Sequence, residues 1–236
     1  MFKFVSKIMM TVMTLIFAVF CLTQASFAAT ESKLTPQSVF GASDDYHFYA
    51  GFVLSGQKYK GIYARIKLPE ALPDVSGSGE SAWVSTNIDD NGEWLQTGVR
   101  YYSGYNGFKL YYEYYVNGKY ECHEPQSVSL GNESTYWIQY NDSSGKWQAC
   151  FAENNSSTGK ILASSVLSTA ENNGVQVNAE LHKEGIQMGP FDFSGVMYYD
   201  NSDGAWHANT KMPTTEPPYE VSGSANNFKV YGPVSD

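Results

Sequence analysis

The stretch FKLYYEYYVNGKYECH, residues 108–123, carries the clearest structural signal in the sequence. From position 108 to 116, one set of apolar residues alternates with a second set that contains Lys109, Tyr111 and Glu113, and this period of two is typical of a β-strand. Asn117-Gly118 follows directly and is a strong signal for a tight hairpin turn. The stretch therefore predicts an antiparallel hairpin with strands at 108–116 and 119–123.

The rest of the sequence has the same character. Short β-rich runs are separated by Gly, Asn, Asp, Ser and Pro, and neither an internal repeat nor a change of composition marks a second domain. The pattern predicts an all-β fold, an antiparallel β-sandwich of two large sheets that forms a single domain over residues 46–236. Further strands are predicted at 48–54, 59–68, 82–88, 94–102, 127–130, 135–140, 147–153, 160–166, 175–182, 188–199 and 228–231, and residues 212–219 are predicted to be irregular.

The first residues differ from the remainder. Lys3 and Lys7 precede an apolar run, and Ser26-Phe27-Ala28 supplies small residues at the spacing of a cleavage site. This pattern predicts a secretory signal peptide over residues 1–28, an N-terminal extension over 29–45 and a secreted, extracellular product. A membrane helix is the rival interpretation, but the apolar run is shorter than the roughly 20 residues that a span needs.

The cysteines and histidines are the residues that could form a disulfide bond or bind a metal ion. Cys122 and Cys150 remain after the signal peptide, so an exported chain would carry either a Cys122–Cys150 disulfide or two buried thiols. The sequence has no C-x-x-C motif and its histidines are scattered, so we expect no metal site. The four histidines are His47, His123, His182 and His207.

Composition limits the classes of function. Lys and Arg total 15 against 24 Asp and Glu, a formal net charge of −9, which argues against nucleic acid and anionic membranes as partners. Nucleophile-elbow, zincin, P-loop and dinucleotide-binding motifs are absent from the sequence. Carboxylates, carboxamides and aromatic residues are left to carry any chemistry. They concentrate in residues 81–99, 111–115 and 175–180, where Gln176, Asn178 and Glu180 share one strand face.

Ordered blocks of the sequence resemble the glutamic peptidases known as eqolisins. The most specific block is SAWV at 81–84 followed by LQTG at 95–98, which is similar to the family's A-W-V and L-Q-T-G segments. The resemblance extends from about residue 46 to 231. The other blocks are AGFVL at 50–54, the strand 59–69 that ends in Leu-Pro, YEYY at 112–115, TGK at 158–160, PFDF at 190–193 and EVSGS at 220–224.

The resemblance implies a concanavalin A-like sandwich of two seven-stranded sheets and a catalytic Gln and Glu. It places these roles on Gln96, in the LQTG block, and on Glu180, at the end of the strand 175–180. It further implies an acid endopeptidase that needs no cofactor and acts on a polypeptide substrate, and we expect a monomer. An ionised Glu180 would take a proton from the attacking water, while the Gln96 carboxamide would hold the water and the developing oxyanion.

Four further residues are expected to bind substrate: Trp83 and Glu113 as groove lining, Tyr111 and Tyr115 as flat apolar walls. Two other functions stay open from the residues alone. A secreted sandwich with exposed Trp94, Trp147 and Trp206 would suit a carbohydrate-binding module. A glycoside hydrolase of similar architecture would need two carboxylates, which Glu113 and Glu180 would supply.

Overall fold

The computed structural model describes residues 47–73, 79–87, 92–165, 172–182 and 188–232. The predicted signal peptide and the N-terminal extension, residues 1–45, lie outside these residues. Within the described ranges, no helix is long and apolar enough to cross a membrane.

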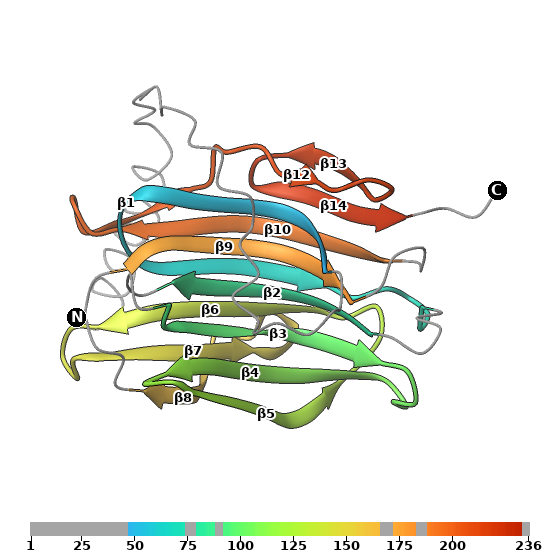
Figure 1. Ribbon diagram of the computed structural model, residues 1–236, viewed down its shortest axis with the longest axis horizontal. Helices are drawn as coiled ribbons and strands as arrows, with labels where there is room; N and C mark the ends of the chain where they lie inside the picture. The colour runs from blue at the N-terminus through green and yellow to red at the C-terminus, as the bar shows by residue number, and fades with distance from the viewer. Residues whose placement is uncertain (1–46, 74–78, 88–91, 166–171, 183–187, 233–236) are drawn as a thin grey trace, which may run out of the picture. The chain divides into compact units, whose positions relative to one another are not determined.

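The fold is built from antiparallel β-strands, as predicted (Figure 1). Besides the strands, the described residues contain one short 3-10 turn, η1 (Glu153–Asn155). The strands are β1 (Phe48–Lys67), β2 (Gly79–Asn87), β3 (Trp94–Tyr102), β4 (Phe108–Val116), β5 (Lys119–Val128), β6 (Glu133–Asn141), β7 (Lys146–Ala152), β8 (Lys160–Ser165), β9 (Asn172–Leu181), β10 (Met188–Asp200), β11 (Ala205–Ala208), β12 (Thr214–Thr215), β13 (Glu220–Ser224) and β14 (Asn227–Gly232).

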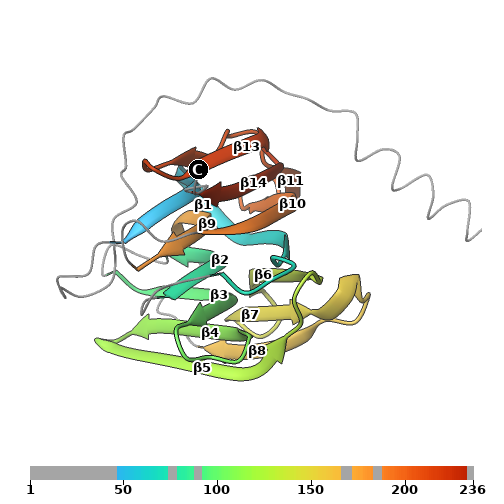
Figure 2. The same cartoon turned by 90° about the vertical axis from the view of Figure 1, so that its right-hand side faces the viewer.

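The long strand β1 belongs to both layers of the sandwich. Its first half pairs with β9, and its second half lies between β6 and β10. The register shifts between Ser55 and Tyr59, where the strand passes from one layer to the other. One layer has the order β12-β1-β9-β2-β3-β4-β5 and the other the order β8-β7-β6-β1-β10-β14-β13, with β11 beside β10. Figure 2 shows the two layers from a second side.

The core fills the space between these layers. Alternate residues of each strand enter it, for example Trp147, Ala149 and Phe151 of β7, all fully buried. In β2 the core residues are Ala82 and Val84, so Trp83 and its alternate neighbours face the outside of their layer. Each large apolar side chain buried in this way stabilises the fold by roughly 1.5–3 kcal/mol.

The strands differ from the prediction in several places. The runs predicted at 48–54 and 59–68 form the single strand β1. The runs predicted at 119–123 and 127–130 form the single strand β5, which has a register shift against β4 between Leu110 and Tyr112. Pro125 is tolerated within it because β5 is the last strand of its layer. The short strands β11, β12 and β13 were not predicted, since their sequences lack an alternating apolar pattern and they form by pairing with β10, β1 and β14.

Of the two alternatives for Cys122 and Cys150, the structure has two free thiols and no disulfide, with Cys150 buried and Cys122 half-buried. Cys150 lies between the core residues Ala149 and Phe151 in β7. Its side chain therefore points to the outer face of its layer. Cys122 pairs in register with Glu113 and packs on the outer face of the other layer. The two thiols therefore point in opposite directions, away from the core that separates them.

Candidate active site

Register brings polar residues of four adjacent strands onto one outer face. Glu180 of β9 pairs with Ser81 of β2, and Ser81 pairs with Arg100 of β3. Four residues before Arg100, Gln96 pairs with Glu113 of β4. Alternate residues share a face, so these side chains all point away from the core residues that separate them in sequence.

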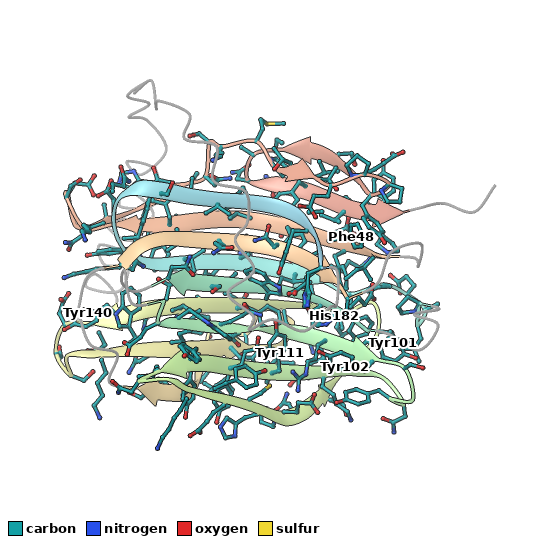
Figure 3. The ribbon with its side chains drawn as sticks, in the orientation of Figure 1. Phe48, Tyr101, Tyr102, Tyr111, Tyr140 and His182 are labelled. Atoms are coloured by element: carbon teal, nitrogen blue, oxygen red, sulfur yellow. The ribbon has the colours of Figure 1, made fainter. Side chains whose placement is uncertain are left out.

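Both predicted catalytic residues line one pocket on this face. The pocket has a volume of about 100 Å³ and its walls come from β2, β3, β4, β5 and the end of β9. Figure 3 shows three of its lining residues, Tyr102, Tyr111 and His182, gathered over the same part of the sheet. The full lining is Ser81, Gln96, Arg100, Tyr102, Tyr111, Glu113, Tyr120, Glu180 and His182.

The Glu180 carboxylate is almost fully buried and is held by several donors. Oε1 contacts Nδ1 of His47 at 2.5 Å. Oε2 accepts hydrogen bonds from Nε1 of Trp83 at 2.8 Å and from Oγ of Ser81 at 3.4 Å. Burial alone would raise the pKa of Glu180, but the bond from His47, the nearby His182 and the bond from Trp83 outweigh it and hold the pKa below its ordinary value. Glu180 is therefore an ionised carboxylate even at moderately acid pH.

The Gln96 carboxamide is held by a different set of partners. Nε2 donates to the hydroxyl of Tyr111 at 2.5 Å and to Oε1 of Glu113 at 3.1 Å. An amide has two N–H donors, so both are used here and Oε1 is the atom left to accept a hydrogen bond. Gln96 can thus hold a water molecule through its oxygen, whereas the expected donation from its N–H groups to an oxyanion is not available in this arrangement.

Glu113 is the second carboxylate of the pocket, and its charge behaves differently from that of Glu180. Its Oε2 accepts a bond from the hydroxyl of Tyr120 at 2.7 Å and lies 3.6 Å from Nη1 of Arg100. Burial raises the pKa of Glu113 to about 7, with the Glu180 charge acting in the same direction, although Tyr120 and Arg100 oppose the shift. Below this pH Glu113 is neutral, so the pocket holds one carboxylate anion and one carboxylic acid.

Arg100, which lines the pocket, is held by residues both outside and inside it. Its Nε contacts Oε1 of Glu124 at 2.5 Å, and the hydroxyl of Tyr105 donates to the same oxygen at 2.9 Å. Its guanidinium lies over the rings of Tyr102 and Tyr111, 5.4 and 5.1 Å from their centroids. These contacts fix a cation beside Glu113 without pairing it with Glu180.

The predicted substrate-binding residues have different places. Tyr111 and Glu113 line the pocket. Trp83 is buried against Tyr49 and Tyr111 and contacts the pocket through Glu180. Tyr115 is half-buried on the same face, opposite Trp94 and Tyr120 in register, and does not line this pocket.

The fold was compared with known proteins. No protein-family model matches the sequence, and no curated protein matches it. Among solved structures, scytalido-glutamic peptidase bound to a peptide-based transition-state analogue matches with a TM-score of 0.57 and 15% identity, covering 79% of this chain and 98% of that chain. SCP-B, a member of the eqolisin family of peptidases in complex with the tripeptide Ala-Ile-His, matches with a TM-score of 0.55 and 14% identity over the same shares.

The fold is that of the glutamic peptidases. At 14–16% identity this likeness establishes the architecture alone. Residue roles have to be argued from the pocket of this chain.

The structure brings to the pocket residues that the sequence prediction missed. His182 lies two positions after Glu180 and therefore on the same strand face. The sequence pattern could have predicted its place near Glu180. His47 gave no signal, because 133 residues separate it from Glu180. The histidines are scattered in the sequence, but the inference that they do not come together was wrong. His47 and His182 lie with their ring centroids 4.6 Å apart. Ser81, Arg100, Tyr102 and Tyr120 were also missed as lining residues.

The tryptophans proposed for carbohydrate binding do not form an exposed platform. Trp147 is fully buried in the core and Trp94 is 3% exposed. Trp206 is half-buried and contacts the rings of Tyr63 and Tyr199 edge-on. A flat surface built from these three residues is therefore not available for stacking on a sugar ring.

Proposed function

We propose that this chain is a secreted acid endopeptidase in which Glu180 and Gln96 activate a water molecule. The observation that carries the proposal is the shared pocket: a carboxylate whose pKa is held low and a carboxamide with its oxygen left to accept a bond line one cavity on the outer face of the sheet. Export is proposed from the leader-like residues 1–28.

In the first step the Gln96 oxygen and the Glu180 carboxylate hold one water between them. The water oxygen attacks the carbonyl carbon of the scissile peptide bond while Glu180 takes a proton from the water. A tetrahedral oxyanion forms. In the second step the protonated Glu180 returns that proton to the leaving nitrogen as the carbon–nitrogen bond breaks, which releases an amine and a carboxylic acid and restores the ionised Glu180.

The oxyanion needs a hydrogen-bond donor, and Tyr111 is suited to this role. Its hydroxyl oxygen accepts the bond from Gln96, so its own proton is directed elsewhere. Burial and the neighbouring Glu113 and Glu180 raise the pKa of Tyr111 well above its ordinary value, so the hydroxyl stays protonated. One such donor is worth about 2.7–4 kcal/mol of transition-state stabilisation. Glu113, neutral in acid, adds no opposing charge.

A glycoside hydrolase is the second candidate, and one observation favours it. Glu113 and Glu180 line the same pocket with pKa values moved in opposite directions, which is the pattern of an acid and a base on either side of a glycosidic bond. In that mechanism Gln96 would be a binding residue rather than a catalytic one.

The test compares hydrolysis of an acid-denatured protein and of β-linked oligosaccharides from pH 3 to 7. The variants are Glu180→Gln, Gln96→Ala and Gln176→Ala. Gln176 lies on the same face as Glu180 but outside the pocket, which makes it the matched control. The peptidase proposal expects proteolysis that Glu180→Gln and Gln96→Ala each reduce at least ~100-fold, consistent with the loss of one preorganised group. Equal proteolysis in all variants, or hydrolysis of sugars alone, would overturn it.

A further inference from the structure

Two histidines and a carboxylate converge at one edge of the pocket. His47 comes immediately before β1, Glu180 is the second-last residue of β9, and His182 directly follows that strand. Antiparallel pairing places Phe48 opposite Leu181 and Tyr49 opposite Glu180, so His47 meets His182 across the two strands. One nitrogen of each ring and one oxygen of Glu180 all lie within 4.8 Å of one another.

These three groups are the ligands that zinc prefers. Imidazole nitrogen and carboxylate oxygen bind Zn²⁺ at about 2.0–2.2 Å, and two histidines with one carboxylate recur in catalytic zinc sites that keep an open position. In a tetrahedral site with such bonds the ligand atoms lie roughly 3.3 Å apart. The cluster needs only small side-chain rotations to reach that spacing: His47 and Glu180 separate from their 2.5 Å contact while His182 moves closer.

The surroundings of the cluster support ligation. Trp83 and Ser81 donate to Oε2 of Glu180, which fixes the carboxylate and leaves Oε1 turned toward the histidine side. The ring of His182 contacts Tyr102 edge-on at 5.4 Å, and the ring of His47 stacks on Tyr49 at 6.2 Å. Hydrogen bonds to a ligating carboxylate, such as those from Trp83 and Ser81, orient metal ligands and raise affinity, while the ring contacts limit where the two imidazoles can turn. Glu180 and His182 also line the pocket, so a fourth coordination position would open into it.

We propose that His47, Glu180 and His182 form a binding site for a divalent first-row transition ion, with Zn²⁺ as the best match. The ion would use the same carboxylate that acts as base in the proposed peptidase, so occupancy should inhibit proteolysis reversibly. This inhibition rests on the proposed function, whereas binding of the ion does not.

The experiment measures zinc binding by isothermal titration and equilibrium dialysis with the full chain at pH 7.5. We expect one ion per chain in the wild type and an affinity at least ~100-fold lower in His47→Ala and in His182→Ala, because each loses one of three ligands. His123→Ala and His207→Ala are matched controls, since each of these histidines also contacts a carboxylate, Glu121 and Asp203 respectively, on an exposed surface. Both controls should keep the wild-type affinity.

Visible absorption of bound Co²⁺ provides a second measurement of metal binding, which does not depend on the variants. Co²⁺ bound by two nitrogens and an oxygen in a four-coordinate site should give intense visible absorption, which Zn²⁺ then displaces. Circular dichroism in the absence of metal checks that each variant is folded. The proposal is overturned if the wild type binds no ion at micromolar zinc, if His182→Ala binds as tightly as the wild type while folded, or if only the control variants lose binding.

The two proposals can fail separately. Zinc binding that depends on His47 and His182 in a chain without peptidase activity would support the metal site and remove the peptidase. Proteolysis in EDTA that Glu180→Gln abolishes, together with no zinc binding, would support the peptidase and overturn the metal site.

Discussion

Gln96 and Glu113 lie directly opposite each other on β3 and β4, and Nε2 of Gln96 donates to Oε1 of Glu113 at 3.1 Å. The contact couples the orientation of the carboxamide to a carboxyl group whose pKa is about 7. In the proposed peptidase mechanism, ionisation of Glu113 would add a negative charge next to the oxyanion. The pair therefore connects the pH of the solution to the state of the pocket.

The first prediction concerns the upper limit of the pH range. In the wild type, kcat/KM for a peptide substrate should fall as the pH rises through about 7, because Glu113 then ionises. Glu113→Gln keeps a neutral group of the same shape, so this decline should disappear or move upward by at least one pH unit. Rates measured from pH 4 to 8 decide the matter, and an identical decline in both proteins would show that another group controls it.

The second prediction concerns the lower limit. Trp83→Phe removes the N–H that donates to Oε2 of Glu180 at 2.8 Å. A hydrogen bond to the ionised form lowers the pKa of an acid, so its loss should raise the pKa of Glu180 and move the acid limb of the kcat/KM profile to higher pH. Trp206→Phe, on the half-buried Trp206 away from the pocket, is the control and should leave the limb in place.

The alternation of apolar residues was enough to predict the all-β fold and most strands, because a half-buried strand has to place every second side chain in the core. The hairpin at Asn117-Gly118 formed where predicted. The passage of β1 between the layers was not predictable, because the exposed residues Gly56, Gln57 and Lys58 at the register shift interrupt its apolar pattern and favour two separate strands at 48–54 and 59–68. The choice between a disulfide and two thiols also stayed open from the sequence, because spacing gives no information on which outer face carries each thiol.

The candidate site was only partly predictable. The LQTG block and the polar row ending at Glu180 predicted Gln96 and Glu180 as site residues, and both line one pocket in the structure. His47 and Arg100 acquire their roles from strand register and from contacts across the sheet, which no local pattern records. Tyr115 lies on the same face of β4 as Tyr111 and Glu113, because alternate residues of a strand share a face. It lies too far along the strand to line the pocket, and the alternating pattern carries no information on that distance.

The third prediction tests the close approach of β2 and β3 under the site. Gly98 lies between Trp83 and Tyr111 in register, and a Cβ at this position would come 2.7 Å from Cβ of Trp83 and 2.2 Å from the carbonyl oxygen of Ala82. Gly98→Ala should therefore displace Trp83 from Glu180, lower stability by about 1–3 kcal/mol and reduce kcat.

A matched glycine separates the two effects of that substitution. Gly104 has a φ of +92°, so Gly104→Ala is strained, but nothing lies within 4 Å of its added Cβ. It should lower the free energy of unfolding in urea without changing kcat measured on the folded fraction. A Gly98→Ala protein with unaltered kcat would mean that the Trp83 position does not matter for the reaction.

The fourth prediction concerns stability, and it follows from Glu80. This residue is fully buried on the core side of β2, where Oε2 accepts the backbone N–H of Gly189 at 2.8 Å and Oε1 finds no hydrogen-bond partner among the described residues. Burial raises the pKa of Glu80 from 4.5 to about 8, so the folded chain keeps this proton over a range in which the unfolded chain loses it.

The sign of the effect follows from proton binding. Between about pH 4.5 and 8 the folded state binds more protons than the unfolded state, so the free energy of unfolding should fall as the pH rises through this range and be greatest at its acid end. Glu113 acts in the same direction up to about pH 7. Urea unfolding of the wild type and of Glu80→Gln at pH 5, 6.5 and 8 should show a shallower decline in the variant, while Glu220→Gln, at an exposed position, should follow the wild type. A wild type that becomes more stable toward pH 8 would show that Glu80 is ionised in the folded chain, and would also remove the physical basis for a protein suited to acid.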